Sequence, residues 1–243
     1  MSIDKAFTKE NLDYYLRELA KEFRKRNGSK MPAEIVLIGG AAVLANYGFR
    51  EMTYDIDAII TASSVMKEAI NAVGDRLELP NGWLNTDFKN TSSFSPKLIQ
   101  YSKHYRTYSG VLNIRTINAE YLVAMKLMSG RRYKKDLSDI VGILNEQKRI
   151  EKPLDYNKID RAVRDLYDSW NGISVYTTEV LKAALESENL EELFEEQVRE
   201  EEASRQEVLR IQKYDKTKIT GSNIDDIINM ALNKKTKVKK NSE

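Results

Sequence analysis

Short apolar runs alternate with longer amphipathic stretches over the first 150 residues. The runs at 35–38, 56–60 and 111–117 are short and rich in β-branched residues, which predicts buried strands. Stretches with apolar residues at helical spacing predict helices between them. These stretches cover 8–26, 63–75 and 119–130, with a further short helix at 41–47. The alternation predicts an α/β fold, with a short mixed sheet flanked by helices.

The pattern changes after residue 150, where strand signals stop. Pro153 breaks the path, and the apolar spacing beyond it predicts helices only. They cover 157–170, 176–185, 186–213 and 224–232. The third is so rich in glutamate that we expect a solvated helix. We therefore predict an α/β domain at 1–150, a helical domain at 151–233 and a basic, disordered tail at 234–243.

One segment, 83–110, fits neither pattern well. It is polar and aromatic, and basic residues lie between its aromatic residues. Such interleaving can stack and clamp a nucleic-acid end. The alternative is a loosely patterned part of the sheet edge, and the sequence leaves both open.

Composition excludes several classes of protein. The 243 residues carry a formal net charge of +2, so no global basic field points to nucleic acid. There is no cysteine and only one histidine, which excludes disulfides, thiol catalysis and histidine-rich metal sites. No apolar run approaches membrane-spanning length, and the N-terminal residues lack the apolar core of a signal peptide. We expect a cytoplasmic protein that does not engage a membrane.

Candidate chemistry gathers between residues 34 and 60. Gly39 and Gly40 stand between a predicted strand and a predicted helix, where backbone amides at the helix start favour phosphate. Asp55 and Asp57 open the next strand and, because strand side chains alternate, share one face. Two neighbouring carboxylates repel each other unless a cation neutralises them. Hard oxygen ligands of this kind suit magnesium.

These residues resemble the signature of the nucleotidyltransferase superfamily. The matching positions are Gly39-Gly40-Ala41-Ala42, Gly48, Arg50, Thr53 and Asp55-Ile56-Asp57. The match is closest to the bacterial AbiE-type toxin nucleotidyltransferases, of the type IV toxin–antitoxin class, and their uncharacterised relatives. The resemblance implies a nucleoside triphosphate bound by Gly39, Gly40, Ala41, Arg50 and Thr53, and Mg²⁺ or Mn²⁺ on Asp55 and Asp57. Two departures stand out: Ala41 replaces a frequent hydroxyl residue, and the spacing from Arg50 to Thr53 is one residue longer than usual.

A second block, about seventy residues later, resembles the same family. It comprises Ala124, Lys126, Leu127, Arg131, Lys135, Asp136, Asp139 and Ile140. The resemblance implies that Lys126 and Arg131 contact the triphosphate, and that Asp136 orients it or supplies a third catalytic acid. The other acid that fits that role is Asp87, the sole acid between Glu78 and Glu120. Without the resemblance, the block could also be a helical hairpin held by surface ion pairs.

The resemblance implies a magnesium-dependent enzyme that moves a nucleoside monophosphate from a triphosphate to an acceptor hydroxyl. The acceptor could be a tRNA end, a protein or a small molecule. Family context also implies a toxin of a toxin–antitoxin pair, with an antitoxin protein as partner. The alternative is a catalytically inactive nucleotide-binding or partner-binding protein, which the missing third acid and Ala41 favour.

Overall fold

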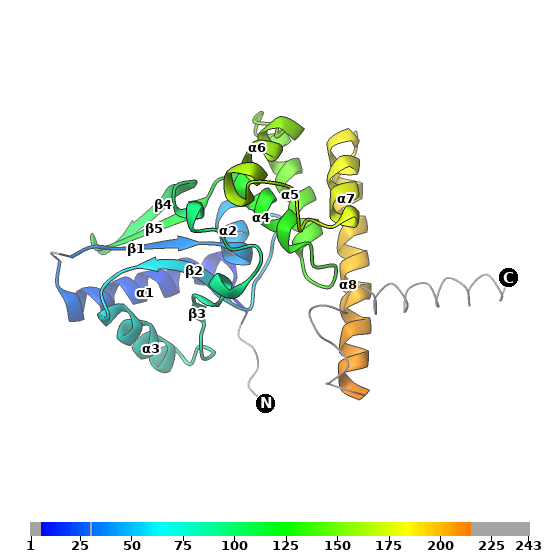
Figure 1. Cartoon of the computed structure of the whole chain (residues 1–243). Coiled ribbons are helices and arrows are strands. Elements are labelled where there is room, and N and C mark those ends of the chain that lie inside the picture. The colour runs from blue at the N-terminus through cyan, green and yellow to red at the C-terminus, as the bar shows by residue number, and fades with distance from the viewer. Residues whose placement is uncertain (1–5, 30, 215–243) are drawn as a thin grey trace.

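The computed structural model describes residues 6–29 and 31–214, and its strands form one mixed five-stranded sheet. The sheet lies in one half of the molecule, and most of the helices lie beyond one of its ends (Figure 1). The strand order is β3-β2-β1-β5-β4. The central strand β1 pairs antiparallel with β2 and parallel with β5. In chain order the strands are β1 (Ala33–Leu37), β2 (Ile56–Thr61), β3 (Leu84–Asn85), β4 (Ser102–Tyr108) and β5 (Leu112–Ile117). The predicted α/β class and mixed sheet are confirmed, while the predicted helix at 224–232 and the tail at 234–243 lie outside the described residues.

Two helices, α1 (Lys9–Asn27) and α3 (Val65–Leu77), lie together along the same side of the sheet (Figure 1). Thr8 caps α1: its hydroxyl accepts from the amide of Asn11, and the Asn11 side chain accepts from the Thr8 amide. Leucines at helical spacing on α1 are fully buried. Each such side chain contributes roughly 1.5–3 kcal/mol by leaving water.

The remaining helices gather at one end of the sheet (Figure 1). They are α2 (Gly39–Asn46), α4 (Ala119–Ser129), α5 (Asp136–Arg149), α6 (Tyr156–Tyr167), α7 (Val175–Glu186) and α8 (Leu190–Tyr214). Helix α4 is buried almost all round because it packs between α5 and α6. Helix α5 in turn packs against α7 and α8. This arrangement brings the second family block against the glycine turn at the start of α2.

The ambiguous segment 83–110 forms both edges of the sheet. It contributes β3 and β4, with two 3₁₀ turns between them, η1 (Asp87–Asn90) and η2 (Pro96–Ile99). Its aromatic side chains make internal contacts: the hydroxyls of Tyr105 and Tyr108 donate to Asp13 of α1 at 3.0 and 2.6 Å. The sheet-edge interpretation is therefore confirmed, and these tyrosines anchor α1 to β4.

The helices of the described residues include none that is both long and apolar enough to cross a bilayer. One prediction of detail needs correction. Helix α8 is not solvated along its whole length, because Glu201 is only 5% exposed.

Candidate active site

The turn between β1 and α2 brings the first family block together in space. A Cβ atom on Gly40 would lie 2.7 Å from Nη2 of Arg50 and 2.8 Å from Oγ1 of Thr53, closer than real Cβ atoms approach other heavy atoms. Gly39 adopts a positive φ of 54°, and a Cβ there would lie 3.5 Å from Oδ2 of Asp57. Close packing therefore favours glycine at position 40, whereas the positive φ favours glycine at position 39, where the 3.5 Å contact is an ordinary one. Five sequence-predicted site residues therefore meet at this turn.

Ala41 follows the two glycines in the first turn of α2. Its side chain is 1% exposed, so it packs inward and presents only its backbone to a ligand. The helix start has no side-chain cap, because Ile38 occupies the N-cap position. Among the described residues, the first amides of α2 thus have no side-chain acceptor. This is the state in which a helix start favours an anion.

Asp55 and Asp57 lie at the beginning of β2. Asp55 is exposed and Asp57 is half-buried, and Ile56 between them is fully buried on the other face, as strand alternation predicts. The Thr53 hydroxyl donates to the Asp55 carbonyl at 3.2 Å and its carboxylate at 3.4 Å. Burial, followed by the negative charge of Asp55, raises the pKa of Asp57 to about 6. The nearby positive charges therefore do not fully compensate this carboxylate pair.

The chemistry of the pair fits a hard divalent cation. Two carboxylates supply oxygen ligands, and Mg²⁺ is commonly bound through one or two protein carboxylates together with substrate phosphates. Within residues 6–29 and 31–214, no group of three or more histidine, cysteine or acidic side chains is placed to hold a metal. If a cation binds here, Asp55 and Asp57 would provide two ligands, and phosphate and water would have to provide the rest.

Asp87 is the third acid near this pair. It is the exposed first residue of η1, and its charge contributes to the raised pKa of Asp57. Its amide donates to Oδ1 of Asn85 at 2.9 Å, and Asn85 is the registered β3 partner of Asp57. Asp87 therefore projects from the strand edge next to the two carboxylates.

The second family block forms a buried ion network between α4 and α5. The Lys126 Nζ atom lies 2.7 Å from carboxylate oxygens of both Asp136 and Asp139, and the lysine is only 5% exposed. Arg131 binds the other side of Asp136, through Nε at 2.8 Å and its backbone amide at 3.2 Å. Asp139 also forms an ion pair with Arg50. Through Arg50, the network touches the glycine turn.

Charge complementarity keeps this network ionised. Burial alone would raise the pKa of Asp136, but the charges of Lys126 and Arg131 hold it well below its usual range. Burial likewise opposes the charge of Lys126, and Asp136 and Asp139 keep its pKa raised. The block is thus a helical pair held by ion pairs, as one interpretation of the sequence allowed, but most of these pairs are buried. Arg131 is the exception, with 44% of its side chain exposed.

Glu201 of α8 is the residue that sequence reasoning missed. Its Oε1 accepts from the amides of Leu137 and Ser138 at 2.7 and 3.2 Å, and its Oε2 accepts from the Ser138 hydroxyl at 2.5 Å. Burial raises the pKa of Glu201 to about 8, against the hydrogen bonds from Ser138 and Leu137, and Asp139 adds to the rise. Nothing in the glutamate-rich sequence distinguishes it from its exposed neighbours.

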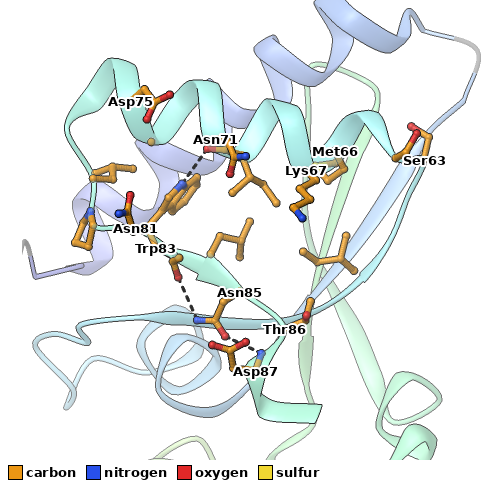
Figure 2. Close-up of a pocket in the computed structure, with 18 residues that line it drawn as sticks. Ser63, Met66, Lys67, Asn71, Asp75, Asn81, Trp83, Asn85, Thr86 and Asp87 are labelled. Atoms are coloured by element: carbon orange, nitrogen blue, oxygen red, sulfur yellow. Dashed lines mark hydrogen bonds between the residues drawn. The ribbon is translucent and has the colours of Figure 1, made fainter. Parts of the chain in front are cut away.

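A cavity of about 710 Å³ opens beside the site, between α3 and the β3 edge of the sheet (Figure 2). Figure 2 shows Lys67 and Asn71 of α3 on one side and Asn85 and Asp87 on the other. The polar lining is mostly neutral, and Lys67 is its one basic residue among the described residues. Asp87 thus belongs both to the rim of this cavity and to the surroundings of Asp57.

Comparison with known proteins identifies one family for this chain. No curated protein and no solved structure matches the chain. One family model matches residues 14–179, more than half of the chain, and is described as nucleotidyltransferase of unknown function (DUF6036). The matched region contains the glycine turn, the carboxylate pair and the ion network, and it ends before α8. The chain therefore belongs to this family of nucleotidyltransferases.

Proposed function

We propose that this protein transfers a nucleoside monophosphate from a nucleoside triphosphate to an acceptor hydroxyl, with a divalent cation. The convergence of the glycine turn, Arg50, Thr53 and the Asp55–Asp57 pair carries the proposal. The family match supports nucleotidyl transfer in general. The metal, the acceptor and the role of each residue belong to the proposal.

The triphosphate would lie at the start of α2. The amides that follow Gly39, including that of Ala41, would donate hydrogen bonds to phosphate oxygens, and the helix dipole would favour the negative charge. Arg131 is the best-placed cation for direct contact, because its side chain is partly exposed and its charge reaches Asp57. Arg50 and Thr53 would hold the turn in place through their side chains, which lie against Gly40. Lys126 would stabilise the helix pair through Asp136 and Asp139 and would not contact the triphosphate, since its ammonium group is already bound to both carboxylates.

Asp55 and Asp57 would hold Mg²⁺ or Mn²⁺, which supplies Lewis-acid stabilisation of charge on the reacting phosphate and on the pyrophosphate leaving group. Catalysis of this class needs positioning and charge neutralisation more than a nucleophilic side chain. The lack of cysteine and the single histidine therefore agree with the proposal.

Two acids were candidates for orienting the acceptor hydroxyl, and their surroundings differ. Asp136 is fully buried, and both of its oxygens are engaged by Lys126 and Arg131. That environment favours a role in orienting the two cations. Asp87 is exposed, influences Asp57 and borders the cavity. We therefore assign the acceptor side to Asp87 and the adjoining cavity.

The test is a label-transfer assay. Each α-labelled triphosphate is incubated with Mg²⁺ and, separately, with total tRNA, a protein fraction and a small-molecule fraction of a lysate. Wild type should label one fraction, and Asp55→Ala or Asp57→Ala should lower the rate by a factor of about 100 or more, the scale of lost charge stabilisation. Glu179→Ala, an exposed acid on α7, serves as the control.

Other outcomes distinguish the alternatives. Wild type that binds triphosphate with Mg²⁺ but labels no fraction would be the inactive nucleotide-binding protein.

The resemblance to AbiE-type toxins extends the proposal to growth inhibition relieved by an antitoxin partner. Induced expression should then arrest growth with wild type and not with Asp57→Ala.

A further inference from the structure

The first turn of α5 has no cap of its own. Lys135 occupies the N-cap position, and its side chain makes no capping hydrogen bond. In most helices the N-cap side chain accepts from the second or third helical amide. Here those amides belong to Leu137 and Ser138, and Glu201 of α8 accepts from both at 2.7 and 3.2 Å. A distant helix thus supplies the missing cap.

The same turn of α5 carries the acids that hold the cations of the candidate site. Asp136 is its first residue and binds Lys126 and Arg131, and Asp139 binds Lys126 and Arg50. The backbone that Glu201 holds lies between these two acids. Any displacement of this turn would therefore move the partners of Arg131 and Arg50.

The position of Glu201 carries an energetic cost. It is 5% exposed, and a buried carboxyl group carries a large desolvation cost unless its hydrogen bonds are satisfied. Both of its oxygens are engaged, one by two amides and one by the Ser138 hydroxyl. Helix α8 lies beyond the matched family region, which ends at residue 179. The chain thus uses a segment outside that region to complete the support of its site.

We propose that Glu201 is a positioning residue for the nucleotide site: it fixes the start of α5 and, through Asp136 and Asp139, the placement of Arg131 and Arg50. This inference rests on the proposed function, because it presumes that a triphosphate binds at the glycine turn. It adds a contribution from α8, which neither the family match nor the two motifs contain.

The test compares nucleotide affinity with folding in the full-length chain. Calorimetry measures the Kd for non-hydrolysable analogues of the four triphosphates, taken in turn with Mg²⁺, at a temperature where circular dichroism shows each variant folded. Glu201→Ala should weaken binding at least fivefold. Glu201→Gln keeps an acceptor for the two amides and a partner for the Ser138 hydroxyl, so its Kd should stay within twofold of wild type. Glu196→Ala, an exposed glutamate on the same helix, is the matched control.

A double-mutant cycle tests whether Glu201 affects nucleotide affinity through Arg131. If it does, Glu201→Ala should weaken binding much less when Arg131 is already alanine. A folded Glu201→Ala protein with the Kd of wild type overturns the inference, because a purely structural role would lower the melting temperature alone. If Glu201→Ala does not fold, Ser138→Ala removes one contact and should weaken binding two- to threefold, and an unchanged Kd overturns the inference. Wild type that binds no triphosphate overturns the proposed function itself.

Discussion

Lys126 offers the sharpest test of how the buried network works. The resemblance implies that this lysine contacts the triphosphate, whereas in the structure its ammonium group is bound to two carboxylates and is 5% exposed. We expect Lys126→Met, which keeps the stem and removes the charge, to lower stability with little effect on nucleotide affinity.

The magnitude follows from what the substitution leaves behind. Breaking a buried ion pair by removing one partner usually costs about 3–5 kcal/mol, because an uncompensated charge remains. Here Asp136 keeps Arg131 and Asp139 keeps Arg50, so the lower end, about 3 kcal/mol, applies. For a chain of this size that loss lowers the melting temperature by roughly 6–12 °C.

Urea or thermal unfolding measures the stability, and calorimetric titration with a non-hydrolysable triphosphate and Mg²⁺ measures the affinity. The combined variant Lys126→Met with Asp136→Asn removes one charge of each sign and should recover part of the lost stability. A Kd raised tenfold or more with an unchanged melting temperature would refute this reasoning and place the ammonium group on the phosphates.

Three further predictions address the turn, the third acid and the α8 contact. Gly40→Ala should cost about 1–3 kcal/mol of stability and weaken nucleotide binding, because its Cβ would overlap Arg50 and Thr53. Gly48→Ala is the control, since a Cβ there meets nothing within 4 Å. Equal effects of the two variants would contradict the packing argument. Asp87→Asn should slow transfer at least tenfold with triphosphate binding within threefold, while Asp136→Asn should weaken binding itself; steady-state kinetics that show the reverse would move the acceptor side to α5. Because burial raises the pKa of Glu201 to about 8 from its ordinary 4.5, with Asp139 adding to the rise, its contribution to stability is complete below pH 4.5 and falls as the pH rises to about 8. Glu201→Gln should remove this fall, which is on the order of 2–5 kcal/mol. The prediction is wrong if the free energy of unfolding changes equally for wild type and variant between pH 5 and pH 9.

Much of the fold was predictable because its signals are local. The apolar runs at 35–38, 56–60 and 111–117 predicted β1, β2 and β5, which lie next to one another in the sheet. Each is short, β-branched and buried, so periodicity and composition agree. The segment 83–110 was ambiguous because edge strands are half-exposed and β3 has only two residues. Such strands are fixed by their neighbour and by tertiary contacts such as those of Tyr105 and Tyr108 with Asp13.

The first half of the candidate site was predictable for the same reason. Gly39, Gly40, Asp55 and Asp57 lie within twenty residues, and strand alternation alone places both carboxylates on one face. In the second block, a spacing of three residues predicts that Asp136 and Asp139 share one helical face. The family resemblance grouped Lys126 with them.

Only the tertiary structure decided what those groups contact. Arg50 and Asp139 are 89 residues apart, and their ion pair joins the two blocks into one site. Glu201 is 63 residues from Ser138, and its carboxylate is distinguished from other glutamates of α8 only by the packing of α8 on α5. Sequence patterns report local geometry and average burial, whereas a buried charge is set by the particular partners that folding brings to it. That is why the motifs could predict which residues gather at the candidate site, and not which residues support them.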